Sequence, residues 1–202
     1  MSYYTWQLDV EVRRRNLIAD HYNWRQHRLL ATHFRSHLAD FFTQPAYDRG
    51  IYRFDNFPMA SAEAALNAPA DTSDLRPLPL TLTTHQKDID YFGHPQTVAQ
   101  FRLDNGDLPP VQSGAGEGAY LVLKSSKNVT YLLPTWPIRE GRKKFLTSGR
   151  LFKEGFSAEF YNENFKKGDY RVGVLTADRH GNQLYYTNNV LRLDSLTAVL
   201  NP

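Results

Sequence analysis

The sequence predicts a mainly β protein whose C-terminal part, about residues 76–202, is an antiparallel β-sandwich of immunoglobulin-like type. Three observations support this prediction. From Leu78 onward, short segments alternate between apolar and polar residues, as at residues 99–103. Turn signals such as Asn105-Gly106 and His180-Gly181-Asn182 separate the segments at intervals of roughly 8–12 residues. No helical pattern of useful length lies between them, which argues against a parallel sheet with crossover helices.

The predicted strands of this part are short and closely spaced. They cover residues 78–83, 99–103, 119–124, 128–133, 143–147, 156–160, 169–176, 183–186 and 190–193. A loop at residues 107–118 is rich in proline and glycine, so we expect it to be mobile and exposed to solvent. Its glycines do not predict a phosphate-binding loop, because a strand rather than a helix follows Gly114, Gly116 and Gly118.

Residues 1–75 are expected to form an α-rich N-terminal segment that either packs on the sandwich or stands apart from it. Apolar and polar residues alternate strictly over residues 4–12, which predicts a strand; the alternative is the end of a helix that begins earlier. A helix is expected over residues 17–41. Its buried face is predicted from apolar residues at helical spacing, namely Leu30, Phe34, Leu38 and Phe41.

The end of the N-terminal segment is less regular. Residues 51–57 predict a short strand, and residues 61–66 predict a helical turn with Ser61 as its N-cap. Residues 67–79 contain three prolines and several Asp, Ser and Thr residues, which is typical of a linker. We therefore expect the domain boundary within this stretch, after residue 75.

The composition excludes several classes of site. The absence of cysteine rules out disulfides, thiolate metal sites and cysteine nucleophiles. The longest apolar run, residues 119–123, is far shorter than the roughly 20 residues of a membrane-spanning helix. The net charge is +3, and the basic residues are spread along the chain apart from clusters at residues 13–15 and 142–144. Nucleic acid is therefore not a predicted partner.

The sequence also lacks a catalytic motif with a definite context. His33 and His37 would share one face of a helix, but no third ligand has telling spacing, so we expect neither a metal nor a cofactor. No Gly-x-Ser-x-Gly elbow is present. The cluster Arg13–Arg15 could bind phosphates or lipid headgroups, but three residues fall short of a polybasic segment, and a solvated helix start is favoured.

Aromatic residues of the β-rich part are the candidate ligand-binding groups. Adjacent pairs such as Tyr185-Tyr186 must point to opposite faces of a strand, so one ring of each pair is available to cover a ligand or a neighbouring element. Flat aromatic rings that are exposed can stack on the C–H surfaces of sugars. The candidate ligand-binding residues are Trp136, Tyr161, Tyr185 and Tyr186.

Part of the chain has a family resemblance. Residues 120–131 (YLVLKSSKNVTY), followed by Arg139, Gly155-Phe156 and residues 168–174 (GDYRVGV), carry it. This pattern, over about residues 98–193, resembles the β-sandwich modules appended to bacterial polytopic membrane proteins, including proteins regarded as membrane glycosyltransferases of cell-surface polysaccharide pathways. No catalytic residue transfers with the resemblance, since the chemistry of such proteins would lie in their membrane portion.

Two functional hypotheses follow. The first is a non-catalytic, soluble module of a bacterial envelope protein, on the extracytoplasmic side, which is structural or binds glycan. Its partner would be a polysaccharide or another envelope protein. The second is a stand-alone enzyme whose active site is assembled from dispersed polar residues. The first is favoured because the sequence shows no nucleophile, metal or phosphate-loop signature.

Overall fold

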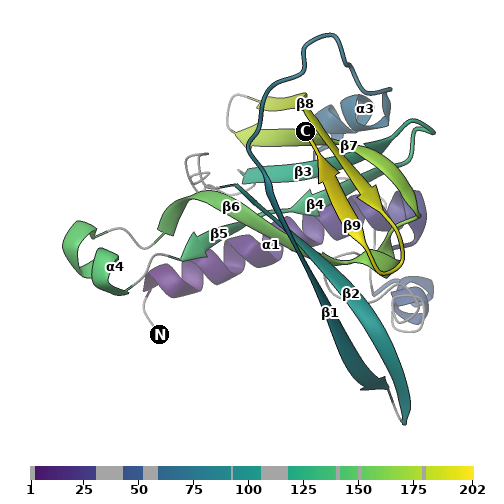
Figure 1. The fold of residues 1–202 in the computed structure, drawn as a ribbon, viewed down its shortest axis with the longest axis horizontal. Coiled ribbons are helices and arrows are strands. Elements are labelled where there is room, and N and C mark those ends of the chain that lie inside the picture. The colour runs from purple at the N-terminus through teal and green to yellow at the C-terminus, as the bar shows by residue number, and fades with distance from the viewer. Residues whose placement is uncertain are drawn as a thin grey trace.

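The computed structural model describes residues 3–30, 43–51, 59–91, 93–105, 118–139, 142–149, 152–178 and 181–202. Two antiparallel sheets face each other, and the helices α1 (Tyr3–His27) and α3 (Ala60–Asn67) cover the outer face of one of them (Figure 1). The prediction of a mainly β, two-sheet fold with an N-terminal helix is confirmed. Among the described helices, each is too short or too polar to cross a membrane.

Both sheets are built from antiparallel neighbours. The four-stranded sheet has the order β1 (Thr81–Tyr91), β2 (His94–Asn105), β6 (Phe152–Tyr161) and β5 (Trp136–Arg139). The five-stranded sheet has the order β4 (Thr130–Pro134), β3 (Gly118–Ser125), β7 (Gly168–Asp178), β8 (Gly181–Leu193) and β9 (Ala198–Asn201). A short helix, α4 (Arg142–Ser148), lies between β5 and β6, and a 3₁₀ turn, η1 (Asn162–Asn164), follows β6.

Strand β3 shows why the sequence contains its longest apolar run here. Alternate residues of a strand point to opposite faces of the sheet. Leu121 and Leu123 therefore face the core between the two sheets, whereas Tyr120 and Val122 face the core beneath the helices. Because both faces are covered, nearly every residue of β3 is buried and the usual polar alternation is absent.

Helices α1 and α3 of the N-terminal segment pack on the sandwich. Ile18, Ala19 and Tyr22 of α1 and Leu66 of α3 share one buried cluster with residues of β3, β4, β7 and β8. This second core lies on the opposite side of the five-stranded sheet from the core between the sheets. The molecule therefore has three layers: the four-stranded sheet, the five-stranded sheet and the helices (Figure 1).

Helix α1 also satisfies the free edge of β4. The Nε2 atom of His27 hydrogen-bonds the carbonyl of Thr130 at 2.7 Å. The amide of Asn23 donates to the carbonyl of Leu132 at 2.7 Å and accepts from its N–H at 3.0 Å. Edge strands expose unpaired backbone groups, and here side chains of the helix provide the missing partners.

The spacing of these contacts follows from the geometry of the two elements. Four residues of a helix rise by about 6 Å, and two residues of a strand rise by about 6.6 Å. His27 and Asn23, four residues apart on α1, can therefore reach Thr130 and Leu132, two residues apart on β4. Continued by one more step, this spacing would bring Ala19, which has no polar group to offer, beside Pro134, which has no N–H to satisfy.

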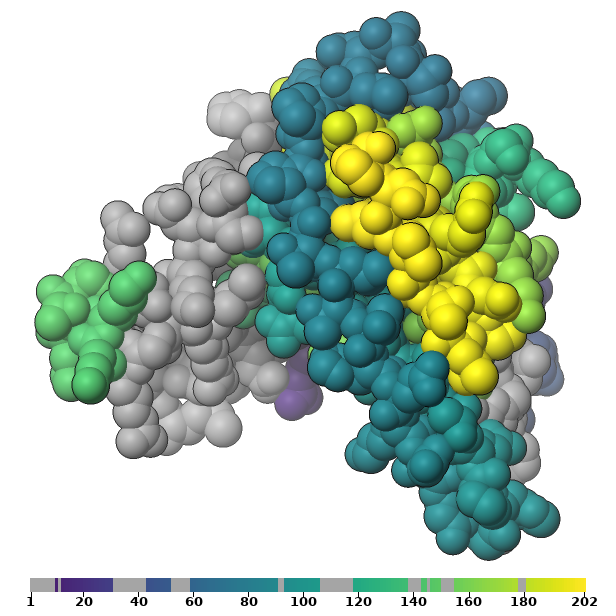
Figure 2. All heavy atoms as spheres, in the orientation of Figure 1, coloured from purple at the N-terminus to yellow at the C-terminus, as the bar shows by residue number. Residues whose placement is uncertain are grey.

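The hairpin of β1 and β2 projects from the body as a two-stranded arm (Figures 1 and 2). Only the second half of β2, from Gln100 onward, pairs with β6. The residues of the arm before Val98 are mostly exposed. Nearer the body, Gln86 of β1 donates to the carbonyl of Leu196 at 3.1 Å, which ties the four-stranded sheet to the end of the five-stranded one.

The strand predicted at residues 4–12 is wrong, because these residues belong to α1. The alternation that suggested a strand also spaces Tyr4, Leu8 and Val12 by four residues, which is the spacing of one helical face. No Gly or Pro separates this stretch from the helical pattern that follows, so the helix continues through both.

The helix predicted at residues 17–41 is confirmed only as far as His27. The helix ends at His27, and the next residue, Arg28, has a left-handed φ of 57° and an N–H that bonds the carbonyl of Trp24 at 2.9 Å. Leu30 is buried beside Trp24, as predicted, but it lies beyond the end of the helix rather than on its face. The remaining predicted residues of that face, Phe34, Leu38 and Phe41, lie outside the described residues.

Two predictions for the β-rich part are corrected, and two strands were missed. Residues 143–147 form helix α4 rather than a strand, in keeping with the helical propensity of Arg, Lys and Leu. The strands predicted at 183–186 and 190–193 are one strand, β8, whose pairing with β7 shifts register between Arg171 and Gly173. Two short edge strands, β5 and β9, were not predicted.

Two further predictions fall near undescribed stretches. Gly118 begins β3 and is buried, and the rest of the predicted mobile loop lies outside the described residues, as do residues 52–57 of the predicted short strand. Ser61 does not cap α3, which begins one residue earlier and has Met59 at its N-cap position. Instead, Ser61 accepts a hydrogen bond from the amide of Asn182 on β8.

Candidate binding pocket

The aromatic candidates of the four-stranded sheet lie in packed surroundings. Trp136 on β5 is partly buried, and its indole stacks on Phe160 with ring centroids 6.2 Å apart and planes inclined by 28°. Its Nε1 donates to the side-chain oxygen of Asn16 on α1 at 3.2 Å. Tyr161 is partly buried at the end of β6.

The candidates of the five-stranded sheet point to opposite faces of β8. Tyr185 is partly buried, and the guanidinium of Arg76 lies 4.8 Å from its ring centroid. Tyr186 is 4% exposed within the core beneath the helices, and burial raises the pKa of its hydroxyl to about 12. The structure therefore does not bring Trp136, Tyr161, Tyr185 and Tyr186 together into one surface.

A pocket of about 510 Å³, lined by both polar and apolar groups, lies at one end of the five-stranded sheet. One wall is the linker that follows α3, and the other is formed by β3, β7 and β8 with the turn between β3 and β4. The lining residues are Pro69, Ala70, Thr72, Lys124, Ser125, Ser126, Asn128, Asp169, Arg171 and Val190. None of them was a sequence-based candidate.

The strand register explains why two basic residues meet in this pocket. Lys124 on β3 stands directly opposite Arg171 on β7, and Arg171 stands opposite Val190 on β8. Directly opposite residues of antiparallel strands lie on the same face of the sheet. Lys124 lies on the same, helix-facing side of the sheet as Val122. Lys124, Arg171 and Val190 therefore form a row on this face, and all three line the pocket.

Lys124 is a buried cation bound to the end of a helix. Only 2% of the surface of this residue is exposed to solvent. Its Nζ donates to the carbonyl of Leu66, in the last turn of α3, at 2.7 Å and to the hydroxyl of Thr130 at 2.6 Å. Carbonyls at a helix C-terminus favour a positive charge, but burial lowers the pKa of Lys124 to about 8.

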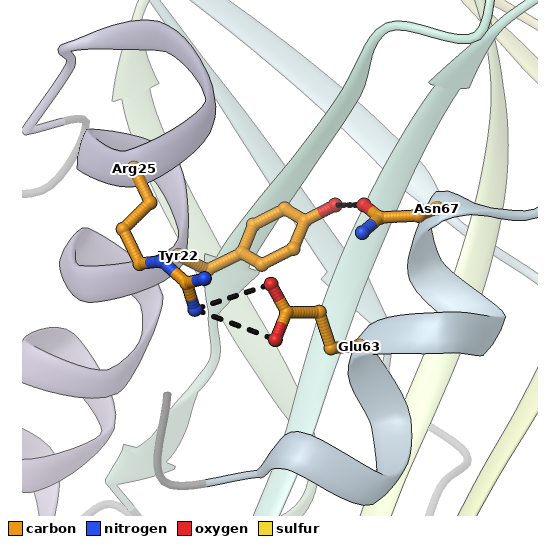
Figure 3. A network of polar contacts seen from close by, with 4 residues as sticks. All are labelled: Tyr22, Arg25, Glu63 and Asn67. Carbon is orange, nitrogen blue, oxygen red and sulfur yellow. Dashed lines mark hydrogen bonds and ion pairs between the residues drawn. The ribbon is translucent and has the colours of Figure 1, made fainter. Parts of the chain in front are cut away.

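A polar network holds the pocket wall in place (Figure 3). The hydroxyl of Tyr22 on α1 donates to the side-chain oxygen of Asn67 at 2.9 Å, and burial raises the pKa of this tyrosine. Arg25 forms an ion pair with Glu63 of α3 at 3.1 Å. The carbonyl of Asn67 accepts from Asn128 in the β3–β4 turn at 3.0 Å. The end of α3 is thus fixed to both α1 and the sheet.

The opposite wall carries a second basic group. The Nη1 atom of Arg171 donates to the carbonyl of Asn188 at 3.0 Å and, at 3.4 Å, to that of Thr187. Asp169 belongs to the same wall and pairs with Arg192 through bonds of 2.7 and 3.2 Å. This hydrogen-bonded pairing lowers the pKa of Asp169, and its charge is balanced by Arg192 rather than by Lys124 or Arg171.

The polar side chains of the pocket set the chemistry it offers to a ligand. Its polar residues offer hydroxyls, an amide, an ammonium and a guanidinium, and Asp169 is the single carboxylate among the described residues that line it. Within the described ranges, no three His, Asp or Glu side chains come close enough to hold a metal ion. Comparison with family models, with curated proteins and with solved structures gave no match to this chain.

One sequence signal could have pointed to the pocket. Lys124 directly follows the apolar residues Ala119 to Leu123 and precedes the turn at Ser125. A lysine that continues a strand buried on both faces must find polar partners or an opening to solvent. Arg171 gives no such signal, because its position opposite Lys124 depends on the pairing of strands almost 50 residues apart.

Proposed function

We propose that this chain is a non-catalytic β-sandwich module of immunoglobulin-like type, and that its pocket at Lys124 and Arg171 holds one unit of a polysaccharide. The observation that carries the proposal is the pocket itself, in which several side chains are hydrogen-bond donors and the one carboxylate among the described lining residues is already paired. Sugar hydroxyls need such donors. Hydrolysis of a glycoside ordinarily needs two carboxyl groups across the bond.

The strand order supports the immunoglobulin-like assignment. In that fold, strands A, B, E and D form one sheet, and strands C, F and G form the other. Taken in chain order, β1-β2-β6-β5 corresponds to A-B-E-D. The order β4-β3-β7-β8 corresponds to the second sheet with one added strand beside C, and β9 extends it beyond G.

A corner contact supports the same assignment. Tyr170 lies near the start of β7, which corresponds to strand F, and its hydroxyl donates to the backbone carbonyl of Lys166 at 2.5 Å. A tyrosine in this place with this bond is a hallmark of immunoglobulin-like domains. Two residues later, where antibody domains carry a cysteine, this chain has the fully buried Val172.

The proposed setting is the extracytoplasmic side of a bacterial envelope, where the partner would be a polysaccharide or another envelope protein. The resemblance of residues 98–193 to modules appended to bacterial membrane proteins supports this setting. A cysteine-free sandwich with two buried cores does not depend on disulfides for stability, so it suits an exported module as well as a cytoplasmic one.

A glycan array probed with the full chain tests the proposal. We expect binding to bacterial surface polysaccharides, loss of that binding in Arg171→Gln, and retention in the control Arg102→Gln, which changes a partly exposed arginine of the four-stranded sheet. Absence of binding to any polysaccharide would contradict the glycan-binding role. Cleavage of a bound polysaccharide would contradict the non-catalytic role and support the hypothesis of a stand-alone enzyme.

A further inference from the structure

Two cationic side chains, Lys124 and Arg171, line the pocket. Lys124 and Arg171 stand directly opposite each other on neighbouring strands, where side chains of like charge are destabilising. In the part of the chain that the structure describes, neither forms an ion pair, and the nearest lining carboxylate, Asp169, is held by Arg192 at 2.7 Å. The two positive charges of the pocket are therefore not balanced by a negative charge of the described residues, and an anionic ligand would supply it.

We infer that this pocket is an anion site, in which a carboxylate or phosphate group of the ligand lies between Lys124 and Arg171. Under the proposed function, on which this step rests for the identity of the ligand, the anion belongs to an acidic sugar unit. A negative group there would relieve the like-charge contact and would gain charge-assisted hydrogen bonds from both residues.

The donors of both residues fit this role. An ammonium has three donors, and the bonds of Lys124 to Leu66 and Thr130 use two of them. A guanidinium has five, and within the described residues the bonds of Arg171 all use Nη1, which leaves Nε and Nη2 for a bidentate contact with an oxyanion.

Neutral donors of the lining fit the rest of such a ligand. Thr72 on the linker and Ser126 in the β3–β4 turn present hydroxyls to the pocket. Asn128 contributes to the same turn and has a φ of 61°, which fixes the turn's shape. A sugar ring with its hydroxyls directed at the turn would place its charged substituent toward the sheet, where the two cations lie.

The charge of Lys124 makes the site sensitive to pH. The charged groups on the elements packed around it are Arg171 and Asp169 on β7, Arg192 on β8, which pairs with Asp169, and Glu63 on α3, which pairs with Arg25 of α1. The hydroxyl of Tyr22 on α1 bonds Asn67, the residue after the Leu66 carbonyl that Lys124 contacts. Tyr22 stays neutral well above pH 8, because burial raises its pKa. Loss of the Lys124 proton is therefore the first change of charge expected in the pocket as the pH rises, and it should weaken the binding of an anion.

Calorimetric titration with matched probes tests the inference. The probes are oligogalacturonate, the neutral galactose oligomer of the same length and inorganic phosphate. We expect oligogalacturonate to bind at least about tenfold more tightly than the neutral oligomer. Arg171→Gln should remove that preference, Arg102→Gln should keep it, and the affinity for oligogalacturonate should fall by up to about tenfold per pH unit above pH 8 as Lys124 loses its proton.

The outcomes separate this inference from the proposed function. Equal affinity for the acidic and neutral oligomers, both lost in Arg171→Gln, would overturn the anion site and leave glycan binding in place. Binding of phosphate without binding of either oligomer would support the anion site and overturn glycan binding. Absence of binding with all three probes would overturn both the anion site and glycan binding. Lys124→Met serves as a second variant, and its folding is checked by circular dichroism before titration.

Discussion

The side-chain amide of Asn23 pairs with both backbone groups of Leu132, through bonds of 2.7 and 3.0 Å that span 109 residues of sequence. A primary amide offers one donor and one acceptor side by side, as does the backbone of a neighbouring strand. Helix α1 therefore acts as the last partner of the five-stranded sheet and closes the edge at β4. A closed edge cannot pair with a strand of another chain.

Replacing Asn23 by Ala should destabilise the protein by about 2–4 kcal/mol, because a buried N–H and a buried C=O of Leu132 both lose their partners. Urea unfolding measures the change. The control is Gln26→Ala, which shortens an exposed side chain of the same helix. Equal losses in the two variants would mean that the amide of Asn23 contributes nothing specific.

The elements that could be predicted from sequence are those with local signals. The run Ala119 to Leu123 predicted β3, and the sequence Ser125 to Asn128 predicted the turn after it, where Asn128 has a left-handed φ of 61°. Residues 143–147 were predicted wrongly, because a five-residue window with apolar Phe145 and Leu146 suits a strand or a helix equally well.

The candidate site could not be predicted because it depends on contacts between distant segments. Lys124 and Arg171 become neighbours through strand pairing, and Leu66 reaches Lys124 only when α3 packs on the sheet. The aromatic candidates were chosen by residue type, and type alone could not separate Tyr185, which is partly buried, from Tyr186, which is in the core.

The corner contact of Tyr170 gives a second prediction. Tyr170→Phe removes the hydroxyl that donates to the carbonyl of Lys166, and we expect a loss of about 1 kcal/mol in the free energy of unfolding. The same substitution at Tyr161, which is partly buried at the end of β6, is the matched control and should cost less. If both variants unfold at the wild-type urea concentration, the corner bond does not stabilise the fold.

Gly173 is required by the ring packed against it. A methyl group at this position would lie 2.9 Å from Cδ1 of Tyr186 and 3.1 Å from the carbonyl of Tyr185. Because both neighbours are held in the sheet, Gly173→Ala should cost about 1–3 kcal/mol. In a double-mutant cycle, the cost should fall when Tyr186→Leu removes the ring; an unchanged cost would place the strain elsewhere.

His27 should make the free energy of unfolding depend on pH in the mildly acidic range. Burial lowers the pKa of its ring below the ordinary value of 6.5, so the unfolded chain takes up the proton more readily than the folded one. The contribution is therefore fully present above pH 6.5 and decreases as the pH falls below it. His27→Gln should show a smaller loss of stability between neutral and mildly acid pH than the wild type. His94→Gln, on the exposed arm, should behave like the wild type.

Lys124 should make the free energy of unfolding depend on pH in the alkaline range, in the same direction as His27, because burial lowers the pKa of both bases. Its folded pKa of about 8 is below the ordinary 10.5, so between these values the unfolded chain binds more protons, and stability rises with pH. Relative to Lys124→Met, the wild type should gain up to about 2 kcal/mol between pH 8 and about pH 9.5. Buried tyrosines also change the stability at alkaline pH, but both proteins contain them, so their contribution cancels in the difference between the two free energies of unfolding. Urea unfolding at each pH gives this difference, with Lys143→Met, an exposed lysine on α4, as the control. A difference that stays flat over this range would mean that Lys124 keeps its ordinary pKa in the folded protein.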